Sequence, residues 1–123
     1  MILVDTSVWI DHLRKGEPVL VENLNAGTVL VHPFVIGEVG LGSLRQRELV
    51  LGALRDLPQA EVATDEEVSA FVEREHLFGL GIGWVDAHLL AAVRLMPGVR
   101  LWSRDKRLAA VAARLGVATE WTN

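Results

Sequence analysis

Cysteine is absent from this chain of 123 residues, and so are long apolar runs. Without cysteine the chain has no disulfide framework, no thiolate nucleophile and no cysteine-based zinc site. Because no run reaches about 18 apolar residues, we expect no membrane-spanning helix. The first residues also lack the basic lead and small-residue cleavage site of a signal peptide, so we expect a cytoplasmic protein.

Basic residues are outnumbered by acidic ones, 12 to 16, which gives a formal net charge of −4. This balance argues against a basic protein that coats DNA, although it leaves local nucleic-acid chemistry open. Half of the residues are hydrophobic, and no linker or repeat divides the chain. We therefore expect one domain over residues 1–123 with a core of its own.

Short apolar runs alternate with helical patterns along the chain, which predicts an α/β fold with a mainly parallel sheet covered on both faces. The expected strands are 2–4, 28–31, 60–63, 99–102 and 117–121. The expected helices are 6–15, 18–26, 33–44, 45–57, 65–78, 85–96 and 103–115, with Asp65 and Ser103 capping two of them. In such a sheet, the loops that leave the strands gather at one edge, where ligands bind.

Three acidic residues stand alone in apolar surroundings, unlike the other acids, most of which lie in mixed charged clusters. Asp5 is the only charged residue in 1–10, Glu38 the only one in 23–44, and Asp86 the only one in 76–93, with histidine counted as neutral. An unpaired ionised acid on a buried face is costly unless a cation or several hydrogen bonds compensate it. These positions are therefore the first candidates for a functional site.

Helical spacing places these acids on apolar stripes. Glu38 shares a stripe with Phe34 and Leu41, which predicts that its carboxylate interrupts a buried face. Asp86 precedes apolar residues at three, four and seven positions, and Asp105 repeats that register. Three of the four acids have an ordinary alternative, since Asp5 and Asp86 are also suited to capping a helix and Asp105 to facing a helix dipole. The ordinary alternative is weakest for Glu38, because an acid in the middle of a helix has no capping role.

The predicted topology brings all four acids to one edge of the sheet. Asp5 ends the first strand, Glu38 lies in the helix that leaves the second, and Asp105 follows the strand at 99–102. Asp86 opens the helix that enters that strand, and an antiparallel crossover helix begins at the same edge. Because like charges about 4 Å apart repel by a few kcal/mol, the cluster predicts a metal. Ligands that are all oxygen favour Mg²⁺ or Mn²⁺.

Four segments carry a family resemblance: 2–10 (ILVDTSVWI), 35–39 (VIGEV), 84–92 (WVDAHLLAA) and 102–108 (WSRDKRL). With these segments, the chain resembles the PIN-domain ribonucleases, specifically the VapC-type toxins of bacterial toxin–antitoxin pairs. The resemblance covers essentially the whole chain. It implies a three-layer α/β/α sandwich, metal-dependent cleavage of RNA, a homodimer, and neutralisation by a cognate VapB-like antitoxin.

The resemblance also implies roles for individual residues. Asp5, Glu38, Asp86 and Asp105 take the places of the acidic quartet, with Thr6 and Ser103 as hydroxyl groups that orient carboxylates. As a hypothesis for hydrolysis, Asp5 and Asp86 are the firmest metal ligands. Glu38 orients or deprotonates the attacking water, directly or as a further metal ligand, and Asp105 completes a second metal site or acts through water.

Basic and aromatic residues supply candidates for substrate contact. The cations beside Asp105 suit RNA phosphates, namely Arg104, Lys106 and Arg107. Tryptophans are able to stack on bases. Core packing is the expected role of Trp9 and Trp102, whereas Trp84 and Trp121 stay open. The four histidines show no metal-binding spacing and are expected to be structural or surface residues.

Two other function classes compete with the nuclease. A catalytically inactive PIN fold would serve as a protein-binding module, which the presence of all four acids argues against. A phosphoacceptor receiver-like domain has a similar length and an acidic edge. It requires adjacent acids after the first strand and an aspartate ending the third, and residues 60–63 supply no such aspartate.

Overall fold

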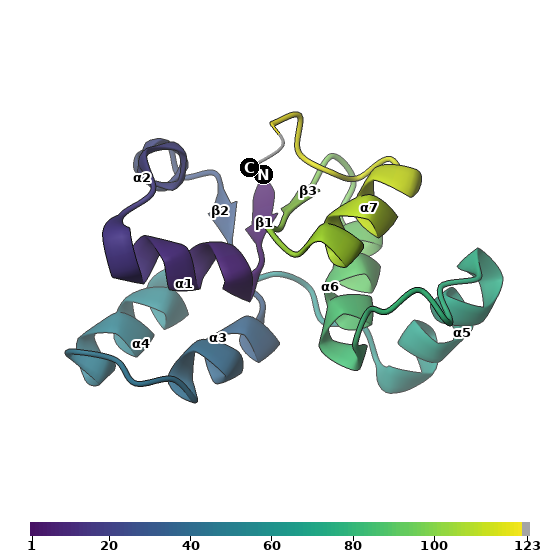
Figure 1. The fold of residues 1–123 in the computed structure, drawn as a ribbon, viewed down its shortest axis with the longest axis horizontal. Helices are drawn as coiled ribbons and strands as arrows, with labels where there is room; N and C mark the ends of the chain where they lie inside the picture. The colour runs from purple at the N-terminus through teal and green to yellow at the C-terminus, as the bar shows by residue number, and fades with distance from the viewer. Residues whose placement is uncertain (122–123) are drawn as a thin grey trace.

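The structure is a computed structural model that describes residues 1–121. In these residues a three-stranded parallel sheet is flanked by seven helices, with β1 between β2 and β3 (Figure 1). The strands are β1 (Ile2–Val4), β2 (Val29–Leu30) and β3 (Arg100–Trp102). The helices are α1 (Thr6–Lys15), α2 (Pro18–Asn25), α3 (Pro33–Gly40), α4 (Arg47–Asp56), α5 (Asp65–Glu75), α6 (Trp84–Leu95) and α7 (Lys106–Arg114). The α/β class predicted from the sequence is confirmed.

The register of the sheet aligns the ends of its strands. Leu3 of β1 pairs with Leu30 of β2 and with Leu101 of β3, and all pairs are parallel. All three leucines are buried, as expected for strands that are covered on both faces. In Figure 1, α1 to α4 lie to the left of the strands and α5 to α7 to the right. Because β1 and β3 are parallel and in register, the chain segments that leave them start from the same edge of the sheet.

Helix α6 is the central helix of the core. Its residues 87–93 are all buried, and it packs against both α5 and β3. Because α6 leads into β3 and runs antiparallel to it, the first turn of α6 lies near the carboxyl edge of the sheet.

No helix in the described residues is long and apolar enough to cross a membrane.

Two predicted strands are absent from residues 1–121 and are replaced by single bridges. Val31 pairs with Gln59, and Leu101 with Ala118, so neither 60–63 nor 117–121 forms a strand. The predicted helix at 33–44 ends at Gly40, and the next begins at Arg47. Two caps also differ from prediction.

Helices α5 and α7 are each capped by a residue near the predicted one. Thr64 rather than Asp65 caps α5, because its hydroxyl and the Glu67 side chain form a reciprocal capping box. Asp105 rather than Ser103 caps α7, because the Ser103 hydroxyl is bonded elsewhere.

Candidate active site

Asp5 is the most deeply buried acid of the predicted site. It follows β1 directly, and only 5% of its surface is exposed. The hydroxyls of Ser7 and Ser103 both donate to its Oδ2 atom, at 2.7 and 2.8 Å. Asp5 occupies the N-cap position of α1, but its side chain makes no capping hydrogen bond. Its carboxylate is therefore turned away from the helix and held by two hydroxyls.

The same two serines fasten the loop between β3 and α7. The Ser7 hydroxyl accepts a hydrogen bond from the Arg104 amide, and the Ser103 hydroxyl accepts one from the Asp105 amide, both at 3.0 Å. Each serine thus links the Asp5 carboxylate to the backbone of this loop. Sequence reasoning assigned Ser103 but missed Ser7, which lies within the motif at residues 2–10.

Glu38 is exposed, which corrects the prediction that it interrupts a buried face. The other residues of that stripe, Phe34 and Leu41, are 36% and 88% exposed, whereas Val35 and Val39 form the buried face of α3. Helix α3 is apolar nearly all round, so its periodicity does not distinguish the two faces. The Thr6 hydroxyl donates to Oε1 of Glu38 at 2.6 Å, and so orients this carboxylate.

Asp86 lies in the first turn of α6 and is half-buried. Burial raises the pKa of its carboxyl, against the effect of the Gly83 amide, which donates to Oδ2 at 2.9 Å. The negative charges of Asp5, Asp105 and Glu38 raise that pKa further. Asp86 therefore experiences all three other acids of the predicted quartet, which places the four in one electrostatic neighbourhood.

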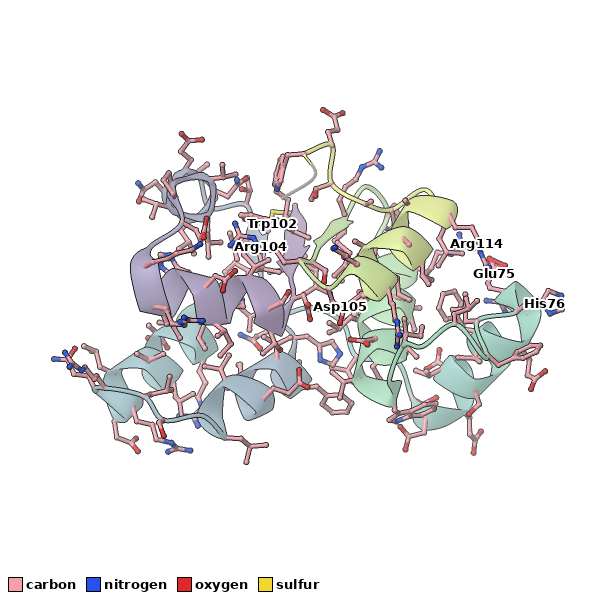
Figure 2. All side chains as sticks on the ribbon, viewed as in Figure 1. Glu75, His76, Trp102, Arg104, Asp105 and Arg114 are labelled. Atoms are coloured by element: carbon pink, nitrogen blue, oxygen red, sulfur yellow. The ribbon has the colours of Figure 1, made fainter. Side chains whose placement is uncertain are left out.

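Asp105 completes this neighbourhood at the start of α7, near the centre of the molecule in Figure 2. Its Oδ1 atom accepts hydrogen bonds from the amides of Arg107 and Leu108, at 2.9 and 3.1 Å. The carboxylate is exposed, and it both caps α7 and contributes to the raised pKa of Asp86. The capping alternative therefore holds for this residue, and its exposure corrects the prediction that it lies on a buried face. Its place in the acidic site stays a prediction.

The four carboxylates share one hydrogen-bonding pattern. In each, a single oxygen is held by hydroxyl or amide donors: Oδ2 of Asp5, Oε1 of Glu38, Oδ2 of Asp86 and Oδ1 of Asp105. Within residues 1–121 no hydrogen bond reaches the other oxygen of any of them. This donor set fits Mg²⁺ or Mn²⁺, which prefer carboxylate oxygens. In that range, no group of three or more acidic or histidine side chains is arranged closely enough to hold a metal ion.

Arg104 does not support its predicted role as a phosphate contact. Its guanidinium donates to Asp11 at 2.8 Å and to both carboxylate oxygens of Glu17 at 2.6 and 2.8 Å. These bonds raise the pKa of Arg104 and lower that of Glu17. In Figure 2 Arg104 lies beside Trp102, whose ring centre is 5.8 Å from the guanidinium carbon. Two carboxylates thus neutralise this cation.

Lys106 and Arg107 are exposed at the start of α7 and remain the basic candidates beside Asp105. Arg107 lies against Gly81, in the glycine-rich loop before α6. A Cβ at Gly81 would stand 2.7 Å from Cδ of Arg107, so a side chain at this position would displace the Arg107 side chain from its place.

The aromatic residues divide as the sequence indicates. Trp9 and Trp102 are buried in the core, which confirms the prediction, whereas Trp84 is 48% exposed. His32 and His88 are buried and His76 is exposed, so these histidines are structural or surface residues as expected.

Comparison with known proteins gives two findings. A profile of the PIN domain family matches residues 2–114. Two proteins named Ribonuclease VapC32, from the CDC 1551 / Oshkosh and ATCC 25618 / H37Rv strains of Mycobacterium tuberculosis, are each 53% identical to this chain over 118 residues. That alignment covers 96% of this chain and 95% of each relative.

Proposed function

Because this chain belongs to the PIN-domain family, among its VapC-type ribonucleases, we propose that it is a metal-dependent endoribonuclease toxin. The observation that carries the proposal is the charge at Asp86. Burial, and after it the charges of three other carboxylates, raises its pKa, and within residues 1–121 each of the four keeps one oxygen without a hydrogen bond. Such a repulsive cluster of oxygen donors is what a divalent cation would neutralise.

A bound Mg²⁺, or Mn²⁺ in its place, supplies charge neutralisation and lowers the pKa of water. Asp5 and Asp86 would hold the cation, and Asp105 would complete a further ligand position. Glu38, oriented by the Thr6 hydroxyl, positions the attacking water and accepts its proton. The water oxygen bonds to phosphorus as the phosphorus–oxygen bond to the leaving ribose breaks.

Other side chains support this chemistry without taking part in it. The Ser103 hydroxyl keeps the Asp5 carboxylate in one orientation, as does Ser7. Lys106 and Arg107 bind phosphates of the RNA on either side of the reacting group. We place the protein in the cytoplasm, where its substrate is available.

The proposal is tested by cleavage of mixed cellular RNA with increasing Mg²⁺, and with chelator as the metal-free reference. Residues that only orient metal ligands are worth about 10–100-fold in activity, so we expect Asp5→Asn to cost more than about 100-fold. Asp56→Asn changes an exposed acid at the end of α4 and serves as the matched control. A folded Asp5→Asn protein that cleaves at the wild-type rate contradicts the assignment. If the intact wild-type protein cleaves nothing at any Mg²⁺ concentration, the protein-binding module is favoured instead.

We further propose that a cognate VapB-like antitoxin neutralises the protein and that the toxin is a homodimer. An apolar cavity of about 290 Å³ supports the first proposal, because it suits the apolar face of a partner helix. It is lined by Trp9, His12, Leu13, Leu24, Leu49, Val50, Ala53, Leu54 and Leu57. We expect Leu49→Asp to prevent co-purification with the antitoxin while RNA cleavage persists. Light scattering of the free toxin measures the oligomeric state.

A further inference from the structure

Two partly exposed aromatic rings, on the helices that carry Glu38 and Asp86, each contact one buried histidine. Phe34 is the second residue of α3, and Trp84 is the first residue of α6. The ring centre of His88 lies 4.7 Å from that of Phe34 and 5.1 Å from that of Trp84, edge to face in both pairs. Phe34 is 36% exposed and Trp84 is 48% exposed, so both keep a free part of their surface.

Hydrogen bonds fix the histidines beneath these rings. His88 is buried, and its Nε2 atom lies 3.0 Å from Oδ1 of Asp65. Because an ionised carboxylate only accepts, this nitrogen carries the hydrogen. His32 is also buried, and its Nδ1 atom accepts from the Phe34 amide at 3.0 Å. The Phe34 and Trp84 rings therefore rest on a support with little freedom to move.

The same two helices carry two of the four acids. Phe34 lies one turn before Glu38 on the exposed stripe of α3, and Trp84 lies two residues before Asp86 in the first turn of α6. The loop that leads into Trp84 also contacts Arg107 through Gly81. Phe34 and Trp84 therefore stand on the two helices that carry Glu38 and Asp86, and the loop before Trp84 contacts Arg107.

The charged groups near the acidic site give RNA little net electrostatic attraction. The carboxylates repel phosphates until cations neutralise them, and Arg104 is neutralised by its two ion pairs. Stacking of a base on an aromatic ring needs no charge and contributes about 1–3 kcal/mol per base. Exposed rings beside the acids offer that uncharged attraction at the place where the charges oppose binding.

We propose that Trp84, with Phe34 beside it, is the platform on which a base of single-stranded RNA stacks next to the phosphate that is cut. This inference rests on the proposed nuclease function and assigns the substrate contact that the acids do not provide. Because every base has a ring face, the platform selects unpaired RNA rather than a particular base. A paired base inside a duplex has both faces covered and is not available to it.

The test measures binding rather than cleavage. In an Asp5→Asn background with Mg²⁺, the Kd of a short labelled single-stranded RNA is measured by fluorescence anisotropy. The stacking energy above corresponds to a loss of about 5–150-fold for Trp84→Ala. Trp84→Phe keeps a ring and should recover most of this affinity.

A matched control is Phe78→Ala, which removes an exposed aromatic ring that packs on His76, at the far end of the molecule from Asp105 in Figure 2. We expect this variant to bind RNA as its parent does. An equal loss for Phe78→Ala and Trp84→Ala would overturn the proposal, because it would show general dependence on exposed rings.

A second measurement does not require the Trp84→Ala protein to be as stable as its parent. RNAs that each lack one base are bound to the protein with Trp84 intact, and one position is expected to show the same loss of about 5–150-fold. That loss should vanish in Trp84→Ala, because the missing base and the missing ring remove the same contact. Equal affinity for all these RNAs overturns the proposal.

The same variant also tests whether an antitoxin or a second copy of the chain binds this surface instead. If Trp84→Ala weakens antitoxin binding or dissociates a dimer and leaves the Kd for RNA unchanged, the surface belongs to a protein partner and the proposal is wrong. Failure of the nuclease function is seen separately, as uncut RNA with the wild-type protein.

Discussion

Replacing Ser103 with alanine removes one hydroxyl that makes two hydrogen bonds at the centre of the acidic site. It donates to the Asp5 carboxylate at 2.8 Å and accepts from the Asp105 amide at 3.0 Å. Ser103 is 8% exposed and Asp5 is 5% exposed, so water does not readily replace the lost donor. Alanine keeps the backbone and the Cβ atom, so the change tests the hydroxyl alone.

The magnitude follows from the bond that is lost. A hydrogen bond to a charged group contributes about 1.5–3 kcal/mol. Because Ser7 still donates to the same oxygen at 2.7 Å, we expect the lower part of this range, about 2 kcal/mol. With an unfolding entropy of about 2.1 cal/mol/K per residue, 123 residues convert this loss into a fall in Tm of about 8 °C.

The assay is urea unfolding followed by circular dichroism, with chelator present so that no cation contributes. Ser69→Ala removes an exposed serine from the middle of α5 and should change stability by less than about 0.5 kcal/mol. In an Asp5→Asn background the lost bond is no longer charged, so the cost of Ser103→Ala should fall to about 1 kcal/mol. A cost below about 0.5 kcal/mol, or the same cost in both backgrounds, refutes the claim that a charged hydrogen bond holds Asp5.

Two further predictions concern charge and backbone at the same site. Burial and neighbouring carboxylates raise the pKa of Asp86 above its ordinary 3.8, so ionising it costs stability as the pH rises through the raised pKa. Asp86→Asn should therefore raise the urea midpoint at about pH 7 in chelator but not near about pH 3, and an unchanged midpoint at neutral pH contradicts this. Gly81→Ala should weaken RNA binding more than Gly79→Ala, because both have positive φ but only a Cβ at Gly81 meets Arg107. Equal effects on Kd count against Arg107 as a phosphate contact.

The burial of Asp5 and the partial burial of Asp86 could be predicted from the sequence, because Asp5 follows the buried residues of β1 and Asp86 precedes the buried residues 87–93 of α6. The same reasoning failed for Glu38, whose helix has apolar residues on both its buried and its exposed face. Periodicity identifies a face only where polar residues mark the opposite one. On α3 the burial of Val35 and Val39 is decided by packing against other helices, which no local pattern records.

Partners that are distant in sequence account for the remaining differences. Arg104 stands beside Asp105 in a basic segment, yet its charge is used by Asp11 and Glu17, 93 and 87 positions away. Ser7 is directed to Asp5 and its neighbour Thr6 to Glu38, because adjacent residues of a helix point in different directions. Short apolar segments such as 60–63 indicate extended backbone, but a strand also needs a neighbour to pair with, and only a single bridge forms beside this segment in residues 1–121.

The four acids of this site contribute to the excess of acidic residues, and hydrogen bonds hold each of them. Hydroxyl and amide donors bind one oxygen of each of the four carboxylates, and burial, followed by the charges of the other three, raises the pKa of Asp86. These hydrogen bonds orient the four carboxylates. The divalent cation that we propose would relieve repulsion among these carboxylates through its charge. We therefore expect the proposed site to favour Mg²⁺ over monovalent ions, because this relief grows with the charge of the cation.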